Sequence, residues 1–73
     1  MMAQKPLDLL HSSLESQVLV TLKDGKEFRG TLKGYDIHMN VVLKNADELV
    51  EGKAVRRLGM VIIRGDNVVV ISP

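Results

Sequence analysis

The middle of the chain reads Tyr35-Asp36-Ile37-His38-Met39-Asn40-Val41-Val42-Leu43, an apolar run with a polar residue at every second position of its first half. Apolar and polar residues also alternate before and after it, which is typical of strands. One strand from residue 27 through residue 46 would be about 20 residues long, far above the usual 5–6. Asp and Asn favour turns because their side chains bond nearby backbone. We therefore expect a break at 35–40, with Asp36, His38 and Asn40 on or beside a tight connection.

Outward from this break, the period-two pattern predicts five strands, at residues 17–22, 27–34, 41–46, 53–63 and 68–71. The first two flank Asp24-Gly25, a hairpin signal because Gly tolerates positive φ. The polar, acidic segment 45–52 is expected to form a loop or hairpin tip, and Arg64–Asn67 a further turn. Gly30 and Gly34 indicate a sharp bend, and Gly59 a bulge.

The segment 6–16 is predicted to be a short helix. Pro6 suits the first helical position, and Asp8 suits the first turn, where the helix dipole favours an anion. Leu7, Leu10 and Leu14 form one apolar stripe. The predicted fold is therefore mainly β: one domain over 1–73, in which a short N-terminal helix packs on a strongly bent, five-stranded antiparallel small barrel (17–73).

The chain is too short to form a large core. It has 73 residues, no Cys and two His, so disulfides and thiolate metal sites are excluded. Oligomerisation is then the favoured source of added stability. The all-apolar segment Val68–Ile71 would be hazardous as an exposed edge, and a neighbouring subunit that paired with it would cover it.

Charge and hydropathy restrict the class of protein only partly. The net charge is +1, which neither implies nor excludes nucleic acid, because a local patch matters more than the sum. No long apolar signal-peptide core and no run of about 18 apolar residues is present. We expect a soluble, cytoplasmic protein without a membrane segment, metal or cofactor.

The polar set Asp36, His38, Asn40 and Arg64 allows several interpretations. As a hydrolase site it lacks a Ser or Cys nucleophile, and as a metal site it lacks a recognised spacing. The polar loop residues could simply bond their own backbone. Alternatively, His and Arg planes can stack on a flat base while Asn reads the base edge as donor and acceptor.

Other polar groups are less informative. Arg64-Gly65-Asp66 matches an adhesion tripeptide, but tripeptides recur by chance and a turn is the better interpretation. Arg56-Arg57 and the pair Lys23 and Lys26 are interpreted as ordinary solvated faces. Three residues near the helix could form a weaker second patch: Lys5, His11 and Tyr35.

Two motifs resemble those of a known family. The segments Asp24-Gly25-Lys26-Glu27-Phe28-Arg29-Gly30 and Gly34–Leu43 together resemble the first signature of the Sm and Sm-like (Lsm) RNA-binding proteins. Ile62-Ile63-Arg64-Gly65-Asp66-Asn67-Val68-Val69 resembles the second. The resemblance covers essentially the whole chain. The minimal length and the short loop between the third and fourth strands are most similar to archaeal members.

The resemblance implies an assembly and a ligand. Family members form rings in which the fourth strand of one subunit pairs with the fifth strand of the next, and archaeal relatives are typically homoheptamers. Each subunit would offer one pocket for uridine-rich single-stranded RNA at the pore, without catalysis. The alternative is a structural small-barrel subunit of a ribonucleoprotein that acts mainly through protein contacts.

The resemblance also implies roles for individual residues. His38 and Arg64 would sandwich the base, and Asn40 would bond the uracil edge. Gly65 would allow close backbone approach to the base. Supporting and lateral roles fall to the remaining residues: Asp36 and Asp66 as partners of Asn40 and Arg64, and Lys5, Tyr35 and His11 as a lateral RNA site.

Overall fold

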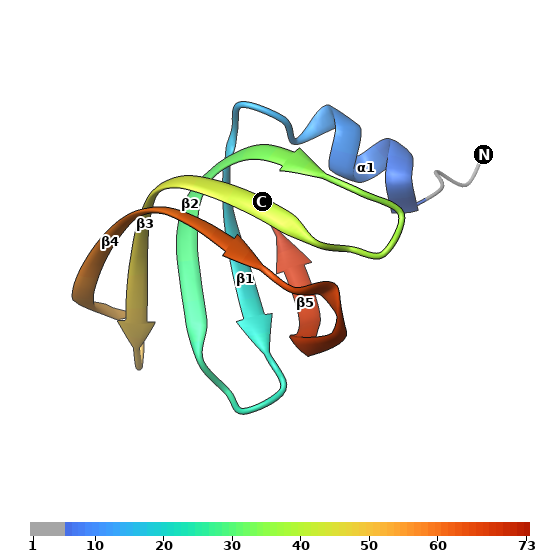
Figure 1. Ribbon diagram of the computed structural model, residues 1–73. Coiled ribbons are helices and arrows are strands. Elements are labelled where there is room, and N and C mark those ends of the chain that lie inside the picture. The colour runs from blue at the N-terminus through green and yellow to red at the C-terminus, as the bar shows by residue number, and fades with distance from the viewer. Residues whose placement is uncertain (1–5) are drawn as a thin grey trace.

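Five antiparallel strands form one curved sheet, and a short helix lies across one end of it (Figure 1). The computed structural model describes residues 6–73. Its sheet has the order β4-β3-β2-β1-β5, so β4 and β5 are the two edges. This confirms the predicted helix followed by five antiparallel strands. The elements are α1 (Pro6–Ser12), β1 (Gln17–Leu22), β2 (Glu27–Tyr35), β3 (Val41–Val50), β4 (Lys53–Ile63), the 3-10 helix η1 (Gly65–Asn67) and β5 (Val68–Ser72).

The predicted break in the middle of the chain is confirmed, because β2 ends at Tyr35 and β3 begins at Val41. The Asp-Gly hairpin is confirmed as well. Gly25 has a φ of 87°, and its N–H donates to the Leu22 carbonyl over 2.9 Å. The Asp24 carboxylate accepts the Lys26 N–H over 3.0 Å, which fixes the tight turn between β1 and β2.

The helix is shorter than predicted: it ends at Ser12, not at Ser16. The hydroxyls of Ser12 and Ser13 both donate to the Leu9 carbonyl, over 2.8 and 2.9 Å, and such bonds compete with helical ones. Glu15 then adopts a φ of 66°, and its N–H donates to the Leu32 carbonyl over 2.8 Å. The connection 13–16 is therefore tied to β2 and does not continue the helix.

The segment 45–52 was predicted to be a loop or hairpin tip, and only its last two residues form the tip. β3 continues to Val50, and the chain reverses at Glu51 and Gly52, which have φ of 51° and 79°. The acidic residues of this segment lie opposite arginines of β4: Glu48 is 3.0 Å from Arg56, and Asp47 is 3.5 Å from Arg57. Cross-strand pairs of opposite charge are compatible with a strand, so acidity alone was a poor signal here.

The predicted bulge at Gly59 is confirmed, since its φ is 74° and the β3–β4 register shifts on both sides of the Ala46–Gly59 pair. The predicted bend also has a local cause at Gly30. A Cβ there would lie 3.0 Å from the Lys44 carbonyl oxygen and 3.1 Å from the Ala46 Cα. Only a glycine lets β2 approach β3 this closely without displacement.

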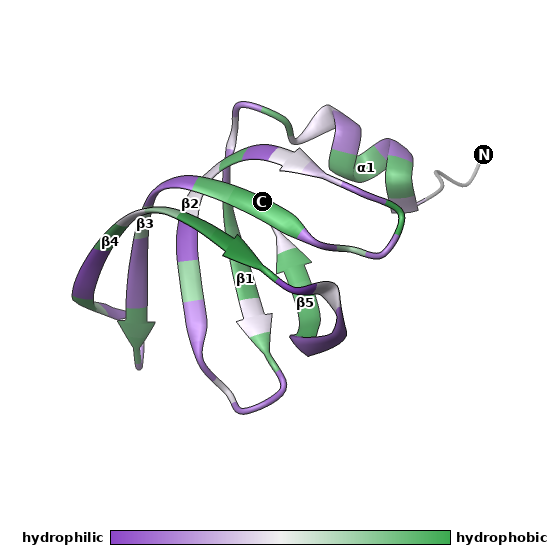
Figure 2. Cartoon of the chain, viewed as in Figure 1, coloured by the Kyte–Doolittle hydropathy of each residue, from purple (hydrophilic) through white to green (hydrophobic). Residues whose placement is uncertain are grey.

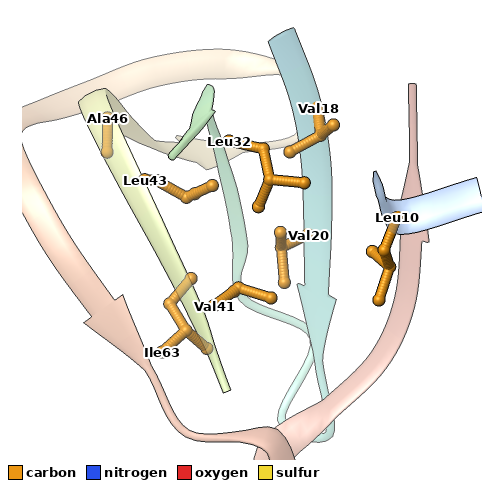
Figure 3. Close-up of a cluster of buried hydrophobic side chains, with 8 residues drawn as sticks. All are labelled: Leu10, Val18, Val20, Leu32, Val41, Leu43, Ala46 and Ile63. Atoms are coloured by element: carbon orange, nitrogen blue, oxygen red, sulfur yellow. The ribbon is translucent and has the colours of Figure 1, made fainter. Parts of the chain in front are cut away.

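The core lies between the concave side of the sheet and α1 (Figure 3). All strands except β5 contribute a side chain with 7% exposure or less, and Leu10 of α1 joins them. Leu14 is partly buried, whereas Leu7 stays 39% exposed, so the apolar stripe of the helix packs only in part. The core members are Leu10, Val18, Val20, Leu32, Val41, Leu43, Ala46 and Ile63.

None of the helices within residues 6–73 has the length and apolarity needed to cross a membrane.

Candidate nucleic-acid interface

Two connections, 36–40 between β2 and β3 and 64–67 between β4 and β5, meet at one end of the sheet. They meet because Val41, which follows the first connection, pairs with Ile63, which precedes the second. Asn40 and Arg64 therefore leave the sheet side by side. One shallow depression is lined by residues of both connections. The structure thereby brings together five of the predicted site residues: His38, Asn40, Arg64, Gly65 and Asp66.

The Asp36 carboxylate organises the first connection. Its Oδ1 accepts the backbone N–H groups of His38 and Asn40, over 2.9 and 3.1 Å, and its Oδ2 accepts the Asn40 side-chain amide over 3.0 Å. The bond from the Asn40 side chain is the main reason that the pKa of Asp36 is lowered; backbone bonds from Asn40 and His38 add to this, against a smaller opposing effect of burial. The ionised carboxylate therefore holds the loop in one conformation.

The Asn40 amide is fixed at both ends. Its Nδ2 donates to Asp36, while its Oδ1 accepts the Gly65 backbone N–H over 2.7 Å. An amide has two N–H donors and two oxygen lone pairs. One N–H and one lone pair of Asn40 thus remain for a ligand, and their positions are determined by the two intramolecular bonds.

Gly65 is required by the packing of the two connections. A Cβ at this position would overlap the His38 carbonyl oxygen and lie 2.7 Å from the Met39 carbonyl carbon. The family resemblance implies that Gly65 lets the backbone approach a base. The close approach that the structure records is to the 36–40 connection. Met39 supports this contact with a φ of 65° and a side chain packed on the core.

The two planar groups of the site, His38 and Arg64, are exposed. The Arg64 side chain is 78% exposed, and its Nη2 lies 3.3 Å from Asp66 Oδ2. An exposed ion pair of this kind adds little to stability and leaves the guanidinium plane open to solvent. Both planes are therefore accessible to a flat ligand.

The lateral set is only partly described. Lys5 lies outside the described residues, and His11 is exposed in the last turn of α1. The Tyr35 hydroxyl donates to the Leu7 carbonyl over 3.4 Å, and the residue packs against the core. A lateral site at these residues stays a prediction.

Across residues 6–73, His, Asp and Glu side chains form no group of three suited to a metal ion.

Relatives of the chain are found in archaea. A protein of Methanosarcina barkeri, named "Putative snRNP Sm-like protein", is 61% identical over 99% of this chain and all of its own length. The Sm protein of Pyrococcus abyssi, solved in complex with a uridine heptamer, is 57% identical, has a TM-score of 0.93, and matches 96% of this chain and 99% of its own.

A more distant solved structure, the P. aerophilum SmAP1 heptamer, is 38% identical with a TM-score of 0.90, over 99% of this chain and 96% of its own. The family model of the LSM domain matches residues 8–73 of the chain. This match includes both connections of the depression and every strand of the sheet. The chain belongs to the LSM domain family of Sm-like proteins.

Proposed function

We propose that this chain forms a heptameric ring that binds uridine-rich single-stranded RNA in one pocket per subunit around a central pore. In this role it is an RNA scaffold or chaperone in small ribonucleoproteins. The observation that carries the proposal is the Asn40 amide, held by Asp36 and Gly65 beside the exposed planes of His38 and Arg64. The Pyrococcus abyssi Sm protein, with its uridine heptamer, supports the choice of ligand.

Base reading follows from the groups that Asn40 leaves free. Uracil presents a carbonyl acceptor next to an N–H donor, and the free N–H and oxygen lone pair of Asn40 complement this pair. Cytosine presents a donor next to an acceptor, which reverses the pattern. Turning the amide over to suit cytosine would break the bonds to Asp36 and Gly65. The fixed amide therefore favours uracil.

Stacking provides affinity at each pocket. His38 and Arg64 are proposed to enclose the base from its two faces, and a stacked base is worth about 1–3 kcal/mol. One such contact gives only weak binding. A ring repeats the pocket, so each further base of the same strand binds intramolecularly and the overall affinity rises by orders of magnitude.

Ring formation is supported by the two free edges of the sheet. β4 exposes Met60 (62%) and Ile62 (73%), and β5 exposes Val69 (59%) and Val70 (49%). Figure 2 shows apolar residues over most of β5 and the end of β4 nearest Arg64. Pairing of β4 with the β5 of the next subunit would cover the exposed apolar residues of both strands and continue the sheet. The P. aerophilum relative, a heptamer, supports the proposed ring number.

The proposed role is not enzymatic. The depression is lined by His38, Asn40, Arg64, Gly65 and Asp66, a set without a Ser, Thr or Cys nucleophile. We place this role in the cytoplasm, which fits a sequence without cysteine.

The test is fluorescence anisotropy with labelled oligouridine, oligocytidine and oligoadenosine of equal length. The wild type is expected to prefer oligouridine. His38→Ala and Arg64→Ala are expected to weaken oligouridine binding at least tenfold, which corresponds to the loss of one stacking partner. Arg56→Ala, which removes the same charge from the far hairpin, is the matched control.

Equal binding of the three RNAs by an intact ring would favour the structural role through protein contacts. Unchanged oligouridine affinity in both His38→Ala and Arg64→Ala would show that the pocket is assigned to the wrong residues. Cleavage of the RNA that disappears in His38→Ala would contradict the non-enzymatic role.

A further inference from the structure

The proposed uridine pocket has little positive charge of its own. It contains one cation, Arg64, and this guanidinium lies 3.3 Å from the Asp66 carboxylate. Asp36 adds a second carboxylate at the edge of the pocket. Affinity of proteins for RNA depends strongly on neutralising phosphates with Lys and Arg. The phosphate that accompanies a bound uridine must therefore be met by a cation outside the pocket.

Several basic side chains of the described residues are already paired with carboxylates. Lys33 pairs with Glu15, and both Arg56 and Arg57 pair with carboxylates of β3. Within residues 6–73, five basic side chains have no ion pair of this kind. These are Lys23, Lys26, Arg29, Lys44 and Lys53.

Only Lys23 among these five is bonded to the segment that forms the pocket. Its backbone N–H donates to the Asn67 carbonyl over 2.9 Å, and Asn67 ends η1, directly after Gly65 and Asp66. Leu22, the residue before it, pairs with Val68 at the start of β5. Figure 1 shows this end of β1 beside the connection that leads into β5. Lys23 is exposed, and its side chain extends from a backbone that adjoins η1.

We infer that Lys23 binds the RNA phosphodiester adjoining the uridine in the pocket. This inference rests on the proposed function, since it concerns the same bound strand. The Asp-Gly turn holds the Lys23 backbone in place, and the flexible stem lets a point charge follow a phosphate without fixed geometry. Lys26, in the same turn, adds a second positive charge nearby.

The inference divides recognition between two elements. The connections 36–40 and 64–67 read the base, and the β1–β2 turn holds the backbone, a division common in nucleic-acid recognition. In a ring the turn is repeated in every subunit, so its lysines would form a circle beside the circle of pockets. Arg29, Lys44 and Lys53 lie within β2, β3 and β4, away from the segment bonded to Lys23, and would take no part.

The experiment measures the affinity for a uridine heptamer as a function of salt concentration. Lys23→Gln is expected to weaken binding at low salt and to reduce the slope of log K against log salt by about 0.7 for each phosphate that is no longer neutralised. Lys23→Arg keeps the charge and is expected to keep the slope. Lys53→Gln, at the tip of the β3–β4 hairpin, removes the same charge elsewhere and is the matched control.

The backbone bond to Asn67 does not depend on the Lys23 side chain, so these variants should fold and assemble. Their preference for uridine over cytidine should equal that of the wild type. An unchanged slope in Lys23→Gln, or an equal reduction in Lys53→Gln, would overturn the inference while leaving the proposed function intact. Failure of the wild type to bind the uridine heptamer would instead overturn the proposed function.

Discussion

The backbone N–H of Gly65 donates to Oδ1 of Asn40 over 2.7 Å. The two residues are 25 positions apart in the sequence, and their bond joins the two connections of the site. The other end of the same amide is bonded to Asp36. The orientation of Asn40 is therefore decided before any ligand arrives, and less conformational freedom is lost on binding.

Substitution of Gly65 should separate the two connections. In Gly65→Ala the new Cβ would overlap the His38 carbonyl oxygen, so the 36–40 connection or η1 must move. We expect a loss of about 1–3 kcal/mol in the free energy of unfolding, typical of overpacking, and a loss of oligouridine affinity. Chemical denaturation and anisotropy measure the two effects. Gly34→Ala is the control, because a Cβ at Gly34 meets nothing within 4 Å; equal stability of the two variants would contradict the packing argument.

Asp36 should control the choice of base. In Asp36→Asn an NH₂ group replaces one carboxylate oxygen, so the side chain cannot accept from His38 and from both donors of Asn40. The preference for oligouridine over oligocytidine should fall about tenfold, the size of one base-reading contact. Asp8→Asn makes the same charge change on α1 and should keep the preference. A full preference in Asp36→Asn would show that Asn40 is held by Gly65 alone.

The same carboxylate predicts a dependence of stability on pH. Because the pKa of Asp36 is lowered in the folded protein, its contribution is fully present above the ordinary value of about 3.9 and is lost as the pH falls through the folded value. The stability difference between the wild type and Asp36→Asn should thus shrink as the pH falls from about 5 to about 2. Urea denaturation over this range measures it, and a constant difference would contradict the assigned cause.

Alternation and strand length were sufficient to predict the arrangement of the elements. The break at 36–40 followed from a strand that would have been too long, and the Asp24-Gly25 turn followed from residue type. The prediction for 45–52 was right for the hairpin tip at Glu51 and Gly52 but missed the continuation of β3 to Val50, because acidic residues are also typical of loops. Their partners, Arg56 and Arg57, lie on another strand, so the signal was non-local.

The residues that form the site could be predicted from the sequence, but their geometry could not. Asp36, His38, Asn40 and Arg64 could be named from residue type, yet the bond from Gly65 to Asn40 depends on the pairing of β3 with β4. The proximity of Lys23 to η1 likewise depends on the register of β1 with β5. Both are long-range consequences of the fold that local patterns do not encode.

Gly30 should limit the curvature of the sheet. In Gly30→Val the branched side chain would enter a space where a Cβ alone lies 3.0 Å from the Lys44 carbonyl and 3.2 Å from the Leu43 Cβ. We expect the free energy of unfolding to fall by at least about 1–3 kcal/mol, because backbone on the facing strand cannot move cheaply. Thermal denaturation measures this, with Gly34→Val as the control in the same strand. Similar melting temperatures for both variants would show that the sheet tolerates a wider separation of β2 and β3.

Met60 should report on ring assembly. It lies on the edge strand β4 and is 62% exposed in the single chain, so Met60→Glu should leave the folded subunit intact. In the proposed ring the added carboxylate would lie among the apolar residues that β4 and β5 bring together, and burying it unpaired is costly. Light scattering should give about 57 kDa for seven wild-type chains of 8.1 kDa and a smaller mass for Met60→Glu, with circular dichroism unchanged. Val50→Glu, at the β3–β4 turn, introduces the same charge at a position of 53% exposure and should keep the wild-type mass. A wild-type mass for both variants would mean that the ring does not close through this part of β4.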